Sequence, residues 1–116
     1  MTLVLALLLL ALAPGPVSAD EKGRPYHHVS VADMATTIHT HVCVSGTVTL
    51  VKREADGDRH VRIESEGHFI VAEEIPKLKA AGTAPTVGQT ITACGISRYD
   101  GKHKWYEVHP VEAWRR

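Results

Sequence analysis

The alternation of apolar and polar side chains predicts several β-strands and little helix. From Ile38 to Lys52 apolar or small residues recur at every second position, which is the period of a strand with one buried face. Gly46, in the middle of this long first strand, predicts a bend or a β-bulge. The inward face is expected to consist of Val42, Val44, Gly46, Val48 and Leu50.

Four further strands are expected, separated by turn sequences. Asp56-Gly57 and Asp100-Gly101 are strong signals for tight hairpins between strands. The second strand is expected over Arg59–Glu64 and the third over His68–Ala72. Alternation does not reveal the inward face of the third strand, because its central residues are all apolar. The fourth and fifth strands are expected over residues 89–97 and 103–111.

Two short helical segments are expected beside these strands. Ser30 and Asp33 have the spacing of a capping box, which predicts a helical turn through about Thr36. Residues 73–82 begin with acids and a proline and end in a glycine, the pattern of a short helix.

This order of elements predicts an all-β domain, a five-stranded Greek-key barrel of the OB type with a short helix between its third and fourth strands. An open β-sandwich or an SH3-like barrel is the alternative architecture. In the OB topology the first strand lies beside the fourth. Cys43 and Cys94 both lie opposite the main apolar series of their strands, so a cross-strand disulfide is expected.

The chain begins with an apolar segment, residues 3–13, that is too short to span a bilayer. A Pro-Gly-Pro sequence follows, and Val17-Ser18-Ala19 is typical of a signal-peptidase cleavage site. The expected organisation is a signal peptide (1–19), a lead-in with a short helical turn (20–37) and one barrel domain (38–116). The protein is therefore expected to be exported, either to a periplasm or to the medium, without a membrane anchor after processing.

The charge composition provides no net attraction toward a nucleic acid or an anionic membrane. The 13 basic residues balance the 13 acidic ones, so steering by net charge is absent. The eight histidines are mostly neutral near pH 7 and add positive charge in mildly acidic solution. A monomer is expected.

Candidate binding residues gather at the two Asp-Gly hairpins, because OB barrels bind ligands between the corresponding loops. The second hairpin interleaves basic and aromatic side chains, which suits stacking on bases together with phosphate contacts. The alternative is that these residues only form and solvate the turns. The expected contacts to a small ligand, an oligonucleotide or an oligosaccharide are Asp58, His60, Lys102, Lys104, Trp105 and Tyr106.

Catalysis is a weaker expectation than binding, although Glu107 with His109, or Asp58 with His60, could form acid–base pairs on one face of a strand. The sequence contains no nucleophile elbow, no phosphate-binding glycine loop and no HExxH motif. Asp56-Gly57-Asp58 resembles the hairpin of staphylococcal-type nucleases, but the downstream pattern of arginine and acid is missing. A phosphodiester hydrolase is therefore the least favoured hypothesis.

Three motifs resemble those of small uncharacterised bacterial exported proteins with an OB-like fold. They are Asp-Gly-Asp-x-His (56–60), Glu-Ile-Pro (74–76) and Trp-Tyr-Glu-Val-His-Pro-Val (105–111). The resemblance extends from Val44 to Trp114 and implies a barrel with a set of special positions, but no activity.

Histidines and carboxylates in these motifs suggest a metal site as the second hypothesis. His60, Glu74 and His109 could converge near one end of the barrel, either as a satisfied polar network or as ligands of a divalent transition metal, Zn or Cu. His39 and His41 could also supply two ligands from one side of a strand. No third ligand stands at a diagnostic spacing beside that pair, so a solvated strand edge is the alternative there.

Overall fold

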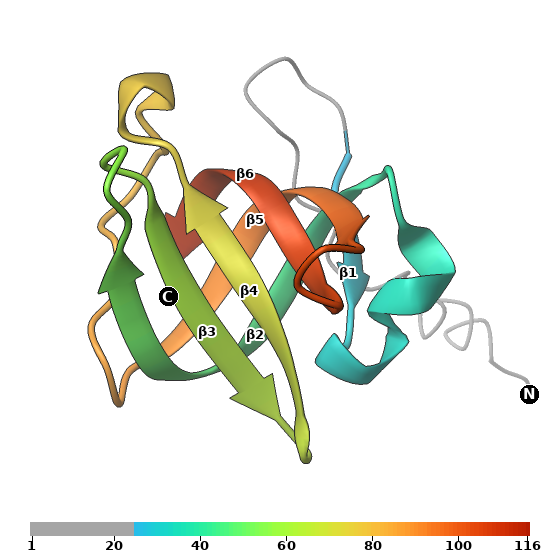
Figure 1. Cartoon of the computed structure of the whole chain (residues 1–116). Helices are drawn as coiled ribbons and strands as arrows, with labels where there is room; N and C mark the ends of the chain where they lie inside the picture. The colour runs from blue at the N-terminus through green and yellow to red at the C-terminus, as the bar shows by residue number, and fades with distance from the viewer. Residues whose placement is uncertain (1–24) are drawn as a thin grey trace, which may run out of the picture.

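The structure, a computed structural model, describes residues 25–116, which form six β-strands, five of them curled into a barrel (Figure 1). The sheet order is β1-β2-β3-β4-β6-β5, and β2 also pairs with β5, which closes the barrel. The strands β4 and β6 pair in parallel, as expected for the last closure of an OB-type barrel. The strands are β1 (His27–Val29), β2 (His41–Arg53), β3 (Arg59–Ser65), β4 (His68–Glu74), β5 (Thr90–Asp100) and β6 (Trp105–Arg115).

Five of these strands, β2 to β6, form the predicted all-β barrel. The sixth, β1, lies in the lead-in and was not predicted. It pairs in parallel with β2, with His27 opposite Val42, and three residues are too few to display alternation. The predicted signal peptide, residues 1–19, lies outside the described residues. Within residues 25–116 none of the helices has the length and apolarity needed to cross a membrane.

The barrel interior is filled by alternate residues of the strands. Val61 and Ile63 of β3 and Ile70 and Ala72 of β4 are all completely buried. Met34, from the 3₁₀ helix Val31–Thr37, is also completely buried and joins the same core cluster. Because neighbouring residues of a strand point to opposite faces, the outward face carries the alternate residues, namely His60, Arg62 and Glu64 of β3 and Phe69, Val71 and Glu73 of β4.

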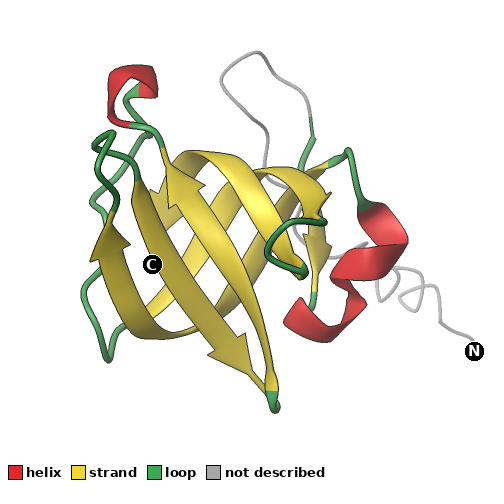
Figure 2. Ribbon diagram, viewed as in Figure 1, coloured by secondary structure: helices red, strands yellow, loops and turns green. Residues whose placement is uncertain are grey.

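Both predicted helical segments are 3₁₀ turns, and the strands dominate the fold (Figure 2). Between the third and fourth barrel strands only Pro76–Leu78 is helical. The chain then runs beside β6, where Ala81 N–H donates to the Glu112 carbonyl (2.9 Å) and Trp114 N–H donates to the Ala81 carbonyl (2.8 Å). Because Ala81 bonds to β6, the chain does not continue the helix that was predicted over residues 73–82.

The position of Leu50 was predicted wrongly. It was expected on the inward face of β2, but its side chain is 51% exposed. The register of β2 against β3 shifts between Val48 and Leu50, so Val51 takes the next inward position. The expected bulge site, Gly46, is instead a point of close approach, where a Cβ would lie 2.5 Å from the Glu64 carbonyl oxygen.

The predicted disulfide is confirmed. Cys43 of β2 and Cys94 of β5 are direct register partners and are joined by an S–S bond of 2.03 Å. Both residues are buried in a small cluster with Tyr26 and Ala113, separate from the main core. The bond therefore links the first and fourth strands of the barrel.

Candidate functional site

A pocket of about 650 Å³ lies on the outer face of the barrel between the two hairpin loops. The strands β2, β3 and β4 form its floor, and the β2–β3 and β5–β6 loops flank it. The shift in β2 places Leu50 on this face, where alternation alone would have buried it. Its apolar lining includes Leu50, Phe69, Val71 and Trp105, and its polar lining includes Lys52, Glu54, His60, Arg62, Glu73 and His103.

The aromatic side chains of the pocket already have partners. The His103 ring stacks on the Trp105 ring with 4.5 Å between centroids, and Phe69 meets Trp105 edge-on at 6.3 Å. The Arg62 guanidinium carbon lies 3.9 Å from the centroid of the Phe69 ring, within the range of a cation–π contact. The pocket therefore has a structured aromatic wall rather than free stacking platforms.

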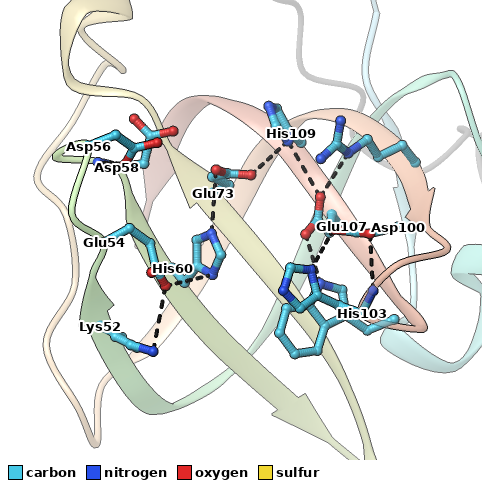
Figure 3. Close-up of polar contacts among 12 residues, drawn as sticks. Lys52, Glu54, Asp56, Asp58, His60, Glu73, Asp100, His103, Glu107 and His109 are labelled. Carbon is cyan, nitrogen blue, oxygen red and sulfur yellow. Dashed lines mark hydrogen bonds and ion pairs between the residues drawn. The ribbon is translucent and has the colours of Figure 1, made fainter.

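At one end of the pocket Glu73 lies between two imidazoles (Figure 3). His109 Nδ1 is 2.7 Å from Glu73 Oε2, and His60 Nε2 is 3.4 Å from Glu73 Oε1. His60 and Glu73 are register partners on β3 and β4. The parallel pairing of Val71 with Glu107 carries His109, two residues further along β6, toward Glu73.

Glu107 lies next to this group and is almost completely buried, at 1% exposure. Its Oε1 accepts a hydrogen bond from Arg98 Nε (2.8 Å), and its Oε2 accepts one from Trp105 Nε1 (2.7 Å). His109 Nδ1 is 3.4 Å from the same Oε1. A buried carboxylate needs such partners, and they fix Glu107 beside the Glu73–His109 pair.

Burial raises the pKa of Glu73 above the ordinary value of a glutamate. The imidazoles of His109 and His60 act in the opposite direction, whereas the Glu107 carboxylate and a hydrogen bond with the Asp58 side chain raise the pKa further. Glu73 therefore retains a proton at a higher pH than an exposed glutamate does.

Buried carboxylate and histidine groups of this site can bind a metal ion. Glu73, Glu107 and His109 each offer a donor atom, and these atoms all lie within 4.8 Å of one another. We call these three residues the donor group. Imidazole nitrogen and carboxylate oxygen are common ligands of Zn²⁺.

A second set, Asp100, His103 and Glu107, meets the same distance limit but is less suitable. Asp100 Oδ1 accepts the backbone N–H groups of Lys102 (2.9 Å) and His103 (3.2 Å), and its Oδ2 lies 2.8 Å from His103 Nδ1. The hydrogen bond with the His103 side chain, followed by these backbone bonds, lowers the pKa of Asp100. Asp100 is therefore already committed to stabilising the hairpin.

Because Asp100 stabilises the hairpin as a carboxylate, its contribution to stability should depend on pH. Asp100→Asn should lower the melting temperature by a few degrees at about pH 7, where the carboxylate is charged in both states. A carboxylate with a lowered folded-state pKa stabilises the fold above its unfolded pKa, and this contribution is lost as the pH falls through its folded-state pKa. Calorimetry should show that the difference in melting temperature between the wild-type protein and the variant is smaller near pH 2 than near pH 7. A difference independent of pH would contradict this role.

Two of the predicted ligand-binding residues, His60 and Trp105, line the pocket. Asp58 does not line it, and its side chain acts only as one of the groups that raise the pKa of Glu73. Lys102 and Lys104 are exposed in the β5–β6 hairpin turn and are not among the lining residues.

Tyr106 points away from the pocket. Its ring lies 4.9 Å from that of Tyr99, and it packs against the main core. Side-chain alternation along β6 explains why Trp105 lines the pocket and Tyr106 does not, since neighbours on a strand point to opposite sides.

The predicted convergence of His60, Glu74 and His109 is wrong in one residue, because Glu73 and not Glu74 lies between the two histidines. Glu74 accepts hydrogen bonds from Arg59 Nη2 and Trp114 Nε1, each at 2.7 Å. The inward face of β4 was undetermined in the sequence, and that face decides which of two adjacent glutamates reaches His60.

The pair His39 and His41 does not form the predicted strand-side ligand pair. His39 precedes β2 and has a φ of 60°, so the alternation argument does not apply to it. His41 Nε2 lies 3.8 Å from Glu112 Oε1. Neither histidine belongs to a possible metal group among residues 25–116.

Sequence reasoning missed Glu54, Glu73 and His103. His60 Nδ1 lies 3.4 Å from Glu54 Oε1, which places Glu54 at the loop side of the pocket. The available signal was pairing: once β3 and β4 form a hairpin around Glu66-Gly67, His60 falls opposite Glu73.

Comparison with known proteins bears on the fold. No protein-family model matches the sequence, and a search of curated proteins gives no match. A solved structure of a chain assigned as an aspartyl-tRNA synthetase from Leishmania major Friedlin is similar, with a TM-score of 0.59 over 78% of this chain at 8% identity. The matched region is 20% of that chain's length, and such a likeness concerns the fold alone. Residues 25–116 thus define a disulfide-bonded OB-like barrel.

Proposed function

We propose that this protein is a small exported binding module whose ligand occupies the pocket between the two hairpin loops. The pocket itself supports this proposal most directly: its volume of about 650 Å³ is typical of small-molecule sites. It lies on the strands and loops that bind ligands in OB barrels. It also combines an apolar wall with a few convergent polar groups, as ligand sites commonly do.

Export, to a periplasm or to the medium, is part of this proposal. The Cys43–Cys94 bond is typical of proteins in oxidising compartments. The apolar segment followed by Val17-Ser18-Ala19 has the pattern of a cleaved signal peptide.

The pocket favours a small molecule or an oligosaccharide over an oligonucleotide. The Lys102 and Lys104 side chains, expected to contact phosphates, lie outside the lining, and the chain has no net charge. His103 already covers Trp105, and Arg62 already covers Phe69. Bases would have to displace these partners in order to stack.

The test is a thermal-shift screen of small aromatic and aliphatic acids, amines and short oligosaccharides. Trp105→Ala should remove at least about tenfold of the affinity of any hit, because it deletes one wall of the pocket. The control, Tyr99→Ala, removes an exposed aromatic side chain that does not line the pocket and should leave the affinity unchanged. Hits that bind equally well to the Trp105 variant would place binding elsewhere.

A second candidate function is binding of a divalent transition metal, Zn or Cu, by the donor group. The observation that favours it is the close approach of three donor atoms from β4 and β6 in a largely buried position. Imidazole nitrogen and carboxylate oxygen are both zinc ligands, and imidazole also suits copper.

Metal binding is tested with protein purified without a histidine tag. Elemental analysis and Zn²⁺ titration calorimetry should show one ion per chain, which chelator removes with a loss of thermal stability. His109→Ala should weaken Zn²⁺ binding by about 100-fold or more, since it removes the only nitrogen ligand. His103→Ala should retain the affinity, because His103 belongs to the other set. Loss in the His103 variant with retention in the His109 variant would assign the ion to that other set.

A further inference from the structure

The donor group lies directly behind the wall of the pocket. Glu73 belongs both to the donor group and to the pocket lining. Trp105, which also lines the pocket, donates its indole N–H to Glu107 Oε2 at 2.7 Å. Glu73 and Trp105 therefore connect the donor group with the pocket surface that a ligand would touch.

The three donor atoms surround one position. His109 Nδ1 is 2.7 Å from Glu73 Oε2 and 3.4 Å from Glu107 Oε1, and all three donor atoms lie within 4.8 Å of one another. When Nδ1 is the acceptor nitrogen of a neutral imidazole, its lone pair and the carboxylate oxygens face the same space. One divalent ion can be held there by all three residues.

Glu107 is held in place for this role. Arg98 and Trp105 each bind one of its oxygens, and a carboxylate has about four lone-pair sites, so Oε1 keeps capacity for an ion. Hydrogen bonds of this kind orient metal ligands in known sites. The fixed position of Glu107 reduces the rearrangement that an ion would need.

A donor group of three residues leaves one position of a tetrahedral ion for another ligand. Zinc sites with four protein ligands are closed, whereas sites with three keep an exchangeable position. Glu73 is the member of the group that lines the pocket, so the pocket side is where an outside ligand can reach the ion.

The charges at this position favour an anion. A divalent ion with Arg98 and the two carboxylates sums to one net positive charge, whereas in the pocket lining Lys52 and Arg62 are balanced by Glu54 and Asp56. The body of the ligand would then lie against the apolar wall of Leu50, Phe69 and Val71.

We propose that a metal ion on Glu73, Glu107 and His109 captures the ligand through an anionic oxygen, and that the ligand is a small carboxylate with an apolar, ring-shaped body. This inference rests on the proposed function, namely the pocket and its metal candidate. It goes beyond them by assigning the ligand class and the atom that binds the ion.

The test uses the protein loaded with Co²⁺, whose visible absorption reports ligand exchange, and benzoate as the probe. Benzoate should change the Co²⁺ spectrum and should bind at least about tenfold more tightly than either benzamide or acetate. Benzamide keeps the ring without the charge, and acetate keeps the charge without the ring. Leu50→Ala, which shortens the apolar wall on β2 away from the donor group on β4 and β6, should keep the Co²⁺ spectrum but reduce the preference for benzoate over acetate.

The outcomes distinguish failure of this inference from failure of the pocket or of the metal candidate. A Co²⁺ spectrum that benzoate leaves unchanged would overturn the inference while the metal candidate stands. Benzoate binding can also be monitored by tryptophan fluorescence in metal-loaded and in chelator-treated protein. Equal affinity of the two forms would overturn the inference and would support a pocket that binds without a metal. Absence of any Co²⁺ spectrum in a folded protein would remove both the inference and the metal candidate.

Discussion

Replacing Cys43 and Cys94 together by alanine is expected to lower the free energy of unfolding by about 4 kcal/mol. The two residues are separated by 51 positions, and the chain-entropy model gives this value for a loop of that length. The disulfide joins β2 to β5, the pairing that closes the barrel. For a domain of this size the loss corresponds to a fall of roughly 15–30 °C in the melting temperature.

Urea denaturation of the oxidised protein, the reduced protein and the double alanine variant measures this effect. Reduction should reproduce most of the change, which separates the cross-link from the packing of the two buried side chains. A difference below about 1 kcal/mol between oxidised and reduced protein would show that the barrel closes without the bond.

Gly95→Ala is expected to prevent stable folding or to cost at least about 3 kcal/mol. A Cβ at Gly95 would lie 2.1 Å from the Pro110 carbonyl oxygen and 2.8 Å from Val108 Cγ1. The first of these atoms belongs to the backbone and cannot rotate away. The pairing of β5 with β6 is irregular at this residue, so the close approach is part of the register that brings β6 to its place.

Gly101→Ala is the matched control on the same hairpin, because the nearest atom to its added Cβ is 3.9 Å away. It should change the unfolding free energy by less than about 1 kcal/mol. Circular dichroism with thermal melts compares the two variants. Equal stability of both would contradict the close approach of β5 and β6.

The barrel was predictable because two kinds of signal agreed. The Asp-Gly turns divided the chain into strands, and the opposite-face positions of Cys43 and Cys94 matched only if the first and fourth strands were neighbours. The departures came from single-residue events that leave no mark on alternation. The shift after Val48 moved Leu50 outward, and backbone bonds from Ala81 to β6 shortened the expected helix.

The site was predictable only in part, because its geometry depends on the face of β4. His60, Trp105 and His109 could be proposed from their own strands. The choice between Glu73 and Glu74 required the inward direction of an entirely apolar segment, and packing settles that direction. The approach of both flanking loops to one pocket is likewise a property of the closed barrel, so Glu54 and His103 carried no signal of their own.

The central claim is that ligands bind on the outer face of the barrel between the two hairpin loops. Its most direct test is a ¹⁵N NMR titration of the protein with benzoate and with the hits of the thermal-shift screen. Binding should perturb the amide signals of His60, Glu73 and Trp105 while those of the Cys43–Cys94 region stay unchanged. Perturbations confined to other surfaces, or none with any compound at about millimolar concentration, would contradict the claim.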